Sequence, residues 1–171
     1  MYINDQYTGG NDNYIFNVPS TGTTGTTTVY VSNSHVISKQ AHSIVWIYLN
    51  SISRNCNFTV FNSRFETTST SNHVVSLINN YSGLIAFKAY NSSFECTAAG
   101  AGVYALYATL IGTSSSVTLS NCSVLSNLTS SMSVDITITA VNTQYKGAID
   151  GGGTITNQIT GAGANACNIQ F

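Results

Sequence analysis

Two glutamates occupy equivalent places in a short phrase that recurs along this chain. Glu66 and Glu95 each lie four residues after an asparagine, Asn62 and Asn91. If consecutive copies of the phrase stack as neighbouring strands, the two carboxyl groups lie about 5 Å apart, the separation found in retaining glycosidases. Two exposed glutamates that pair with Arg64 would have the same spacing. The pattern therefore allows a catalytic pair and a solvated ion pair.

The other residues that could do chemistry form no recognisable pattern. The three histidines, His35, His42 and His73, do not share a position in the repeat, and no G-x-S-x-G motif occurs. The remaining acids are scattered at Asp5, Asp12, Asp135 and Asp150. We therefore expect neither a metal site nor a cofactor.

The recurring phrase alternates apolar residues, then reads asparagine, small residue, any residue, apolar residue. Its copies span 29–36, 58–65, 87–94 and 117–124, and they place the asparagines at Asn33, Asn62, Asn91 and Asn121. The intervals between these asparagines are 29, 29 and 30. A fixed period in this range indicates a solenoid. An antiparallel sandwich would explain the alternation but not the period.

Each asparagine is predicted to turn a corner between two strands. The apolar positions lie four and two residues before it and three residues after it, so the inward face shifts by one position at the asparagine. Asparagine tolerates the left-handed backbone conformation that a tight bend needs. If identical corners stack, their side-chain amides form a ladder.

A second apolar run precedes each phrase. Its copies begin at Val45, Val74 and Val103, again at intervals of 29, with an earlier copy at 14–18 and a later one at 134–138. The runs are short and rich in β-branched and aromatic residues, as strands are. The segment 154–157 is a candidate for a degenerate fifth corner at Asn157, although Gly153 replaces an apolar residue there.

The phrase resembles the second strand, asparagine-ladder corner and third strand of right-handed parallel β-helices, a superfamily that includes pectate lyases and phage tailspikes. The resemblance implies an all-β, single-domain right-handed parallel β-helix solenoid over 1–171, with about 29 residues per coil and 4–5 coils. Residues 1–13 would form an N-terminal cap or arm, 14–145 the repeats, and 146–171 a degenerate last coil and tail. Polysaccharide lyases of this architecture typically use several aspartates and a catalytic Arg or Lys, and no such acidic cluster is present.

Composition narrows the partners. Only 6% of residues are charged, and the net charge is −1. Nucleic-acid binding needs a basic surface, and a membrane-spanning helix needs about 20 apolar residues, so we expect neither a nucleic-acid partner nor membrane insertion. The cysteines, Cys56, Cys96, Cys122 and Cys167, occupy different positions in the repeat. Unpaired buried thiols are favoured over disulfides.

The first-strand runs are apolar on both faces, which predicts that the outward face is covered. A neighbouring subunit is favoured as the cover over the chain's own tail. If the regular interval holds, the outward contact residues are Trp46, Tyr48, Val75, Leu77, Tyr104 and Leu106.

We therefore expect a structural subunit that assembles with copies of itself into a fibre, filament or surface coat, in an extracellular location or on a virion surface. The alternative is a carbohydrate-binding or polysaccharide-degrading β-helix, in which Glu66 and Glu95 line a groove with Tyr90 and contact surface glycans.

Overall fold

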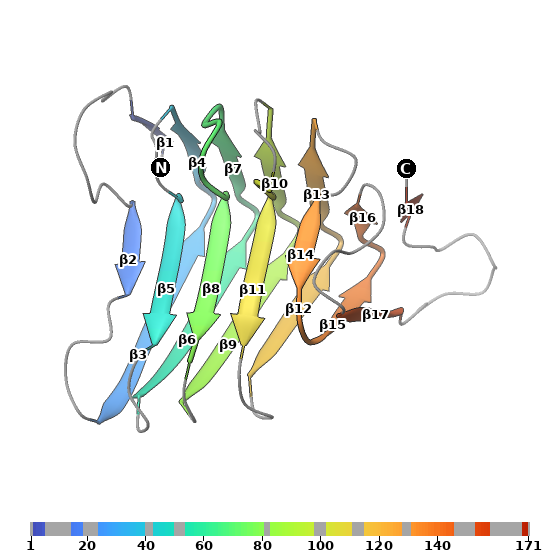
Figure 1. Ribbon diagram of the computed structural model, residues 1–171. Helices are drawn as coiled ribbons and strands as arrows, with labels where there is room; N and C mark the ends of the chain where they lie inside the picture. Colours follow the sequence, from blue (N-terminus) through green and yellow to red (C-terminus); the bar gives the residue numbers. More distant parts are fainter. Residues whose placement is uncertain are drawn as a thin grey trace.

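The chain forms three parallel sheets that wind around one core (Figure 1). The computed structural model describes residues 2–5, 15–18, 24–39, 43–49, 54–80, 83–97, 102–110, 115–127, 131–145, 153–157 and 169–170. Every strand pairing in these segments is parallel, and they contain no helix. The all-β parallel solenoid expected from the sequence is confirmed.

Each sheet collects one strand from every turn. The first-strand sheet contains β2 (Phe16–Val18), β5 (Val45–Leu49), β8 (Val75–Asn79), β11 (Leu106–Leu110) and β14 (Met132–Val134). The second-strand sheet contains β3 (Gly25–Ser32), β6 (Arg54–Phe61), β9 (Leu84–Tyr90), β12 (Ser116–Ser120), β15 (Thr137–Val141) and β17 (Thr154–Asn157). The third-strand sheet contains β1 (Tyr2–Asp5), β4 (His35–Ser38), β7 (Arg64–Thr67), β10 (Ser93–Cys96), β13 (Ser123–Ser126), β16 (Gln144–Tyr145) and β18 (Ile169–Gln170).

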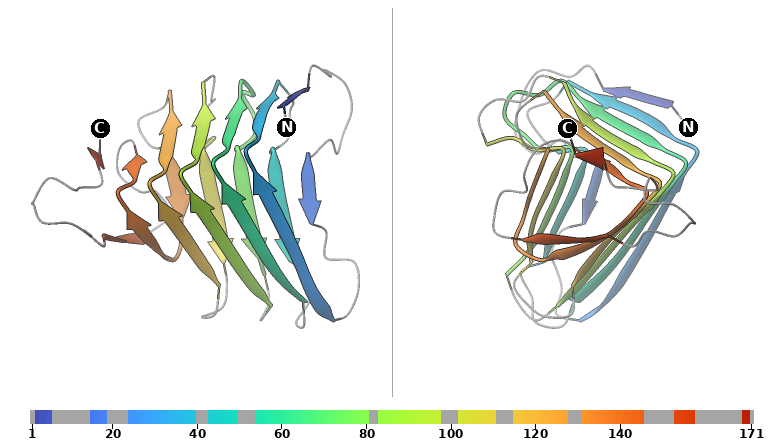
Figure 2. Two further views of the ribbon diagram at one scale, coloured as in Figure 1. Left: turned by 180° about the vertical axis from the view of Figure 1, so that it is seen from behind. Right: turned by 90° about the vertical axis from the view of Figure 1, so that its right-hand side faces the viewer.

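The path of a turn is seen along the solenoid axis in Figure 2, where the three sheets enclose the core. From Asn33 to Asn121 the chain makes three regular turns of about 29 residues, fewer than the 4–5 coils predicted. A shorter fourth turn follows, because Asn142 comes only 21 positions after Asn121. Incomplete turns at both ends supply the remaining strands.

The predicted corners lie at the four asparagines. Their φ angles are 49° at Asn33, 47° at Asn62, 48° at Asn91 and 52° at Asn121. This is the left-handed region, which asparagine adopts more readily than other residues with a Cβ. The chain therefore turns from the second-strand sheet to the third-strand sheet at these residues.

A fifth corner lies at Asn142, with φ 47°. The prediction of Asn157 for this role is wrong, because Asn157 pairs with Ala140, two residues before the corner. The predicted first strand at 134–138 is also corrected. Val134 ends β14, whereas Ile138 belongs to β15 in the second-strand sheet.

Gly153 is explained by close packing in the last turn. Its N–H donates to the carbonyl of Val134, and a Cβ built on it would lie 2.5 Å from the carbonyl oxygen of Ile136. Only glycine fits so near a neighbouring backbone.

The core consists of inward-facing residues stacked from turn to turn in the predicted register. The stacks are Val29/Phe58/Phe87/Val117, Val31/Val60/Ala89/Leu119 and Val36/Phe65/Phe94/Val124, and all of these except the half-buried Val29 are buried. Phe58 and Phe87 lie with ring centroids 5.9 Å apart, and Phe65 and Phe94 with centroids 5.6 Å apart. Each such aromatic pair contributes about 0.5–1.5 kcal/mol beyond the area it buries.

One corner residue tests how much the backbone conformation contributes. We expect Asn62→Ala to lower the free energy of unfolding by about 1–2 kcal/mol, because alanine is strained at positive φ. Asn62→Gly removes the same amide without this strain, and should destabilise less. Urea denaturation of the two variants measures the difference. Equal losses would show that the side-chain amide, and not the backbone conformation, is what the corner requires.

Candidate functional site

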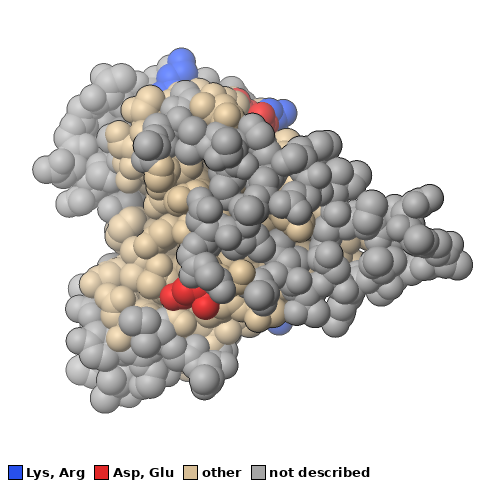
Figure 3. All heavy atoms as spheres, turned by 45° about the vertical axis from the view of Figure 1, so that its right-hand side comes forward, with Lys and Arg blue, Asp and Glu red and all other residues tan. Residues whose placement is uncertain are grey.

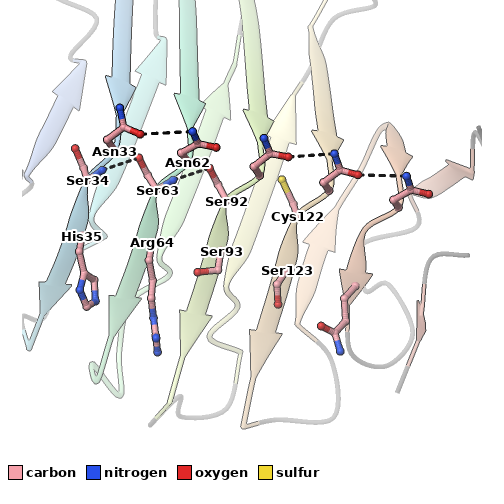
Figure 4. Close-up of a pocket in the computed structure, with 14 residues that line it drawn as sticks. Asn33, Ser34, His35, Asn62, Ser63, Arg64, Ser92, Ser93, Cys122 and Ser123 are labelled. Atoms are coloured by element: carbon pink, nitrogen blue, oxygen red, sulfur yellow. Dashed lines mark hydrogen bonds between the residues drawn. The ribbon is translucent and has the colours of Figure 1, made fainter. Parts of the chain in front are cut away.

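A polar groove runs along the corner between the second- and third-strand sheets (Figure 4). It has a volume of about 1130 Å³ and extends from the corner at Asn33 to the corner at Asn142. Three rows of residues line it: the corner asparagines, the residues that follow them, and the first residues of the third strands. The third row reads His35, Arg64, Ser93, Ser123 and Gln144.

The corner asparagines form a ladder of exposed side-chain amides. Nδ2 of Asn62 donates to Oδ1 of Asn33 at 3.5 Å, and Nδ2 of Asn121 donates to Oδ1 of Asn91 at 3.0 Å. Asn142 continues the row with a donation to Asn121 at 3.2 Å. Between Asn62 and Asn91 the row is interrupted, because these two side chains share no hydrogen bond (Figure 4). The ladder is therefore present, but it is not continuous.

A second row, of buried hydroxyl groups, lies directly beneath the asparagines. Oγ of Ser63 donates to the carbonyl of Phe61 at 2.8 Å and accepts the backbone N–H of Ser34 at 3.1 Å. Ser92 repeats both bonds one turn later, accepting from the N–H of Ser63. A buried backbone N–H requires a hydrogen-bond acceptor. At the bend these hydroxyls provide it, in place of a carbonyl of a neighbouring strand.

Cys122 takes the place of a serine in this row, with its sulfur 3.3 Å from the carbonyl of Ser120. Burial raises its pKa, and burial likewise raises the pKa of Cys56 to about 11 despite the nearby Arg54. Cys56 and Cys122 are free and buried, as expected for unpaired thiols, and Cys96 is buried too. Cys167 lies outside the described residues. A thiol whose pKa is raised by burial is a poor nucleophile, so Cys56 and Cys122 act as core residues.

Glu66 and Glu95 are direct neighbours in the third-strand sheet, as predicted. Both carboxylates bind the same guanidinium, since Nη2 of Arg64 lies 3.0 Å from Oε2 of each. His35 lies 3.9 Å from Glu66. Neither glutamate lines the corner groove. Glu95 lines a smaller hollow of about 490 Å³, but Glu66 and Tyr90 do not, and Tyr90 belongs to β9 on the other side of the corner. The geometry is that of a shared ion pair, with no free carboxylic acid placed beside a free carboxylate.

The ion pair gives a prediction that depends on salt. At low salt, Arg64→Gln leaves two neighbouring carboxylates without their shared cation, and we expect a loss of up to about 1 kcal/mol in unfolding free energy. The loss should shrink at about 1 M NaCl, because salt screens interactions between exposed charges. Arg64→Gln combined with Glu95→Gln should recover most of the loss at low salt. Urea denaturation at both salt concentrations measures this, and a loss that is unchanged at high salt would contradict the electrostatic cause.

The predicted contact face of the first-strand sheet needs correction. Val75, Leu77 and Leu106 point into the core and are at most 2% exposed, so they cannot contact a partner. Val45 pairs with Val75 and not with its neighbour Val74, and Val75 in turn pairs with Leu106. The paired residues are 30 and 31 positions apart in the sequence, whereas the prediction assumed 29. A change of one residue in register moves every side chain to the opposite face of a strand.

The outward residues of this sheet are therefore a different set. Trp46 and Tyr48 remain outward and half-buried, as does Tyr104, which precedes β11. The neighbours in register with Trp46 and Tyr48 are Ser76, Ile78, Tyr107 and Thr109. No described residue of this sheet is a large, exposed apolar side chain.

His73 lies beside this face and is held in its neutral form. Its ring stacks on Tyr107 with centroids 4.4 Å apart, and its Nδ1 accepts the N–H of Tyr104 at 3.0 Å. Burial lowers the pKa of His73 to about 4. The histidine therefore joins two turns as a neutral aromatic ring and hydrogen-bond acceptor.

This pKa makes folding stability depend on pH. The unfolded chain protonates His73 near pH 6.5, whereas the folded chain does so only near pH 4. The stabilisation is present above pH 6.5 and should be lost progressively as the pH falls towards 4. His73→Asn keeps an acceptor but does not titrate, so its urea midpoint should fall less between pH 6.5 and 5. Parallel midpoints for both proteins would exclude His73 as the cause.

The N-terminal end of the second-strand sheet is an open edge. Its last strand, β3, pairs only with β6 among the described strands. Thr26, Thr28 and Tyr30 are exposed, and Tyr30, at 65%, is the one large hydrophobic side chain exposed in the described part of the chain. An unpaired strand edge of this kind is a template for another strand.

Charged side chains and possible metal ligands are few on the described surface. In the space-filling view of Figure 3 the blue and red groups are few, and one red group lies against a blue one near the upper edge. Within the described segments no group of three or more His, Cys, Asp or Glu side chains could hold a metal ion. These segments also contain no helix long and apolar enough to cross a membrane.

The class of this protein is defined by its fold, because comparisons with known proteins add no relative. No protein-family model matches it, and neither the curated proteins nor the solved structures contain a match. The chain is a parallel β-solenoid with polar corner ladders. A fold of this kind identifies an architecture and does not by itself identify an activity.

Three features of these surfaces were not recognised in the sequence. The Asn142 corner follows the full phrase in 138–145, and its unusual spacing hid it. The serine after each asparagine was visible as the small residue of the phrase, but its inward hydrogen bonds were not. Tyr30 lies in the most N-terminal copy, and only the strand order shows that this copy is an edge.

Proposed function

We propose that this chain is a structural subunit that assembles with copies of itself into a fibre, filament or surface coat, outside the cell or on a virion surface. The observation that carries the proposal is the open edge of β3, which spans Gly25–Ser32 without a charged side chain. Natural proteins usually protect such edges with charges, proline, bulges or a covering segment. The exposed threonines and Tyr30 offer none of these protections to the strand itself.

The chemistry of the remaining surface supports the same proposal. Glu66 and Glu95, the strongest catalytic candidates, share the Arg64 cation. The serine row bonds to the backbone of the corner, and the asparagine side chains bond to one another. Near-zero net charge lowers the repulsion between copies. Relationship to the pectate lyase and tailspike superfamily forms part of this proposal, and the repeated corner between second and third strands supports it.

The face around Trp46 and Tyr48 is a second candidate surface for assembly. It retains three of the six residues first assigned to it, since Tyr104 is also outward and half-buried. Side-by-side contact through this face would be independent of the β3 edge.

Assembly can be tested with charges placed on two strands in the same register. We expect the unmodified chain to be multimeric at micromolar concentration by light scattering, and Thr28→Lys to reduce its mass, because a buried lysine at an edge opposes pairing. Ser116→Lys is the matched control, since Ser116 is exposed in the same register as Thr28 but on an internal strand.

The outcomes separate the possibilities. A stable monomer of the unmodified chain over this concentration range would contradict the proposed function. Multimers that Thr28→Lys leaves intact would show that assembly uses another surface, such as the face around Trp46 and Tyr48.

A further inference from the structure

The β3 edge is accessible along most of its length. From Thr26 to Tyr30, each residue is more exposed than its partner on β6: Thr28 is exposed where Asn57 is half-buried, and Val29 is half-buried where Phe58 is fully buried. The difference fits the strand order, in which no described strand lies on the other side of β3.

Simple head-to-tail stacking of two copies does not fill this edge. The third-strand sheet begins one strand before the second-strand sheet, because β1 pairs with β4 whereas β3 has no described strand beyond it. At the other end, β17 and β18 extend both sheets by one strand beyond β15 and β16. A stacked copy that paired its β3 with β17 would place its β1 where β18 already lies.

We infer that β3 pairs antiparallel with β3 of a second copy around a two-fold axis. This inference rests on the proposed function and names one of its contacts. A two-fold β3 contact joins two copies, and a longer assembly needs a further contact, such as the face around Trp46 and Tyr48. A two-fold contact uses the same patch on both copies, so one exposed edge supplies both halves of the interface. Antiparallel pairing needs only the two β3 edges to meet and does not place β1 against β18.

The residues of β3 select a register for the pair. Opposite residues must project from the same face of the sheet, so at the two-fold axis one residue lies opposite its own copy. If that residue is Val29, Thr28 lies opposite Tyr30 of the second copy, an aromatic and β-branched pair of the kind that stabilises sheets. Centring on Thr28 would instead place Gly25 opposite Val31, and Gly25, with φ 123° at the start of β3, has no side chain to pack in such a pair.

Charges do not oppose this arrangement. The strand itself has no ionisable group other than the Tyr30 phenol. Arg54 on β6 donates a hydrogen bond from Nη2 to Oγ1 of Thr27 on β3, at 3.4 Å. Thr27 faces inward, so this contact lies on the opposite side of the sheet from Thr28 and Tyr30. The outward row of the pair is therefore uncharged.

Cysteine cross-linking tests the inferred register on the outward face. In a Cys167→Ser background, we expect an equimolar mixture of Thr28→Cys and Tyr30→Cys chains to form mixed disulfide dimers under mild oxidation. Directly opposite residues have Cα atoms about 4.5–5.5 Å apart, within the range of a disulfide. Each variant alone should cross-link several-fold less, because its cysteines would be diagonal, about 7–8 Å apart. Ser116→Cys, on an internal strand, is the control.

Mass spectrometry of tagged chains identifies which cysteines join. Predominant joining of residue 28 to residue 28 would overturn the register centred on Val29. A multimeric chain without any β3 cross-link would overturn the inference and leave the proposed function standing. A monomeric chain without cross-links would overturn both.

Discussion

The left-handed backbone at the corner asparagines is the constraint on which the rest of this structure depends. At each of these residues the alternation of inward and outward side chains shifts by one position. The N–H of the asparagine donates to a backbone carbonyl of the next turn, that of Asn33 to Phe61 and that of Asn62 to Tyr90. The bend is thereby fixed in position relative to both neighbouring sheets. Core stacks, hydroxyl row and groove follow from this single conformation repeated turn by turn.

Polar residues at this corner have structural roles in two layers. The outer amides bond to each other in solvent, and the inner hydroxyls supply buried backbone N–H groups with acceptors. A buried donor without a partner would cost about 1–3 kcal/mol, so the inner layer contributes more to stability than the exposed one. A chain rich in Asn and Ser can thus be polar without being reactive, and the thiol of Cys122 fits the same role.

The second and third strands could be predicted from the sequence because the phrase joins them without any insertion. Residues such as Phe58 and Phe65 keep a constant distance from Asn62, so their direction follows from it. The first strands could not be placed in the same way. Connections of varying length separate them from the corners, and a difference of one residue exchanged the faces of Val75 and Leu77. The sequence allowed either a catalytic pair of glutamates or an ion pair with Arg64. Only the side-chain distances show that Arg64 pairs with both glutamates.

The shortened last turn gives the molecule two unequal ends. Its corners are separated by 21 positions, where a regular turn has about 29, so roughly 26 Å of extended chain is missing from the circumference. The shortening falls in the strands as well as in the connections. β14 has three residues where β5, β8 and β11 have five, and two residues separate β14 from β15 where four or five separate the equivalent strands of earlier turns. The solenoid consequently tapers, and its cross-section narrows from the broad end bounded by β3 towards the C-terminal strands. A tapered rod has an intrinsic direction, and its narrow end cannot match the outline of a broad one.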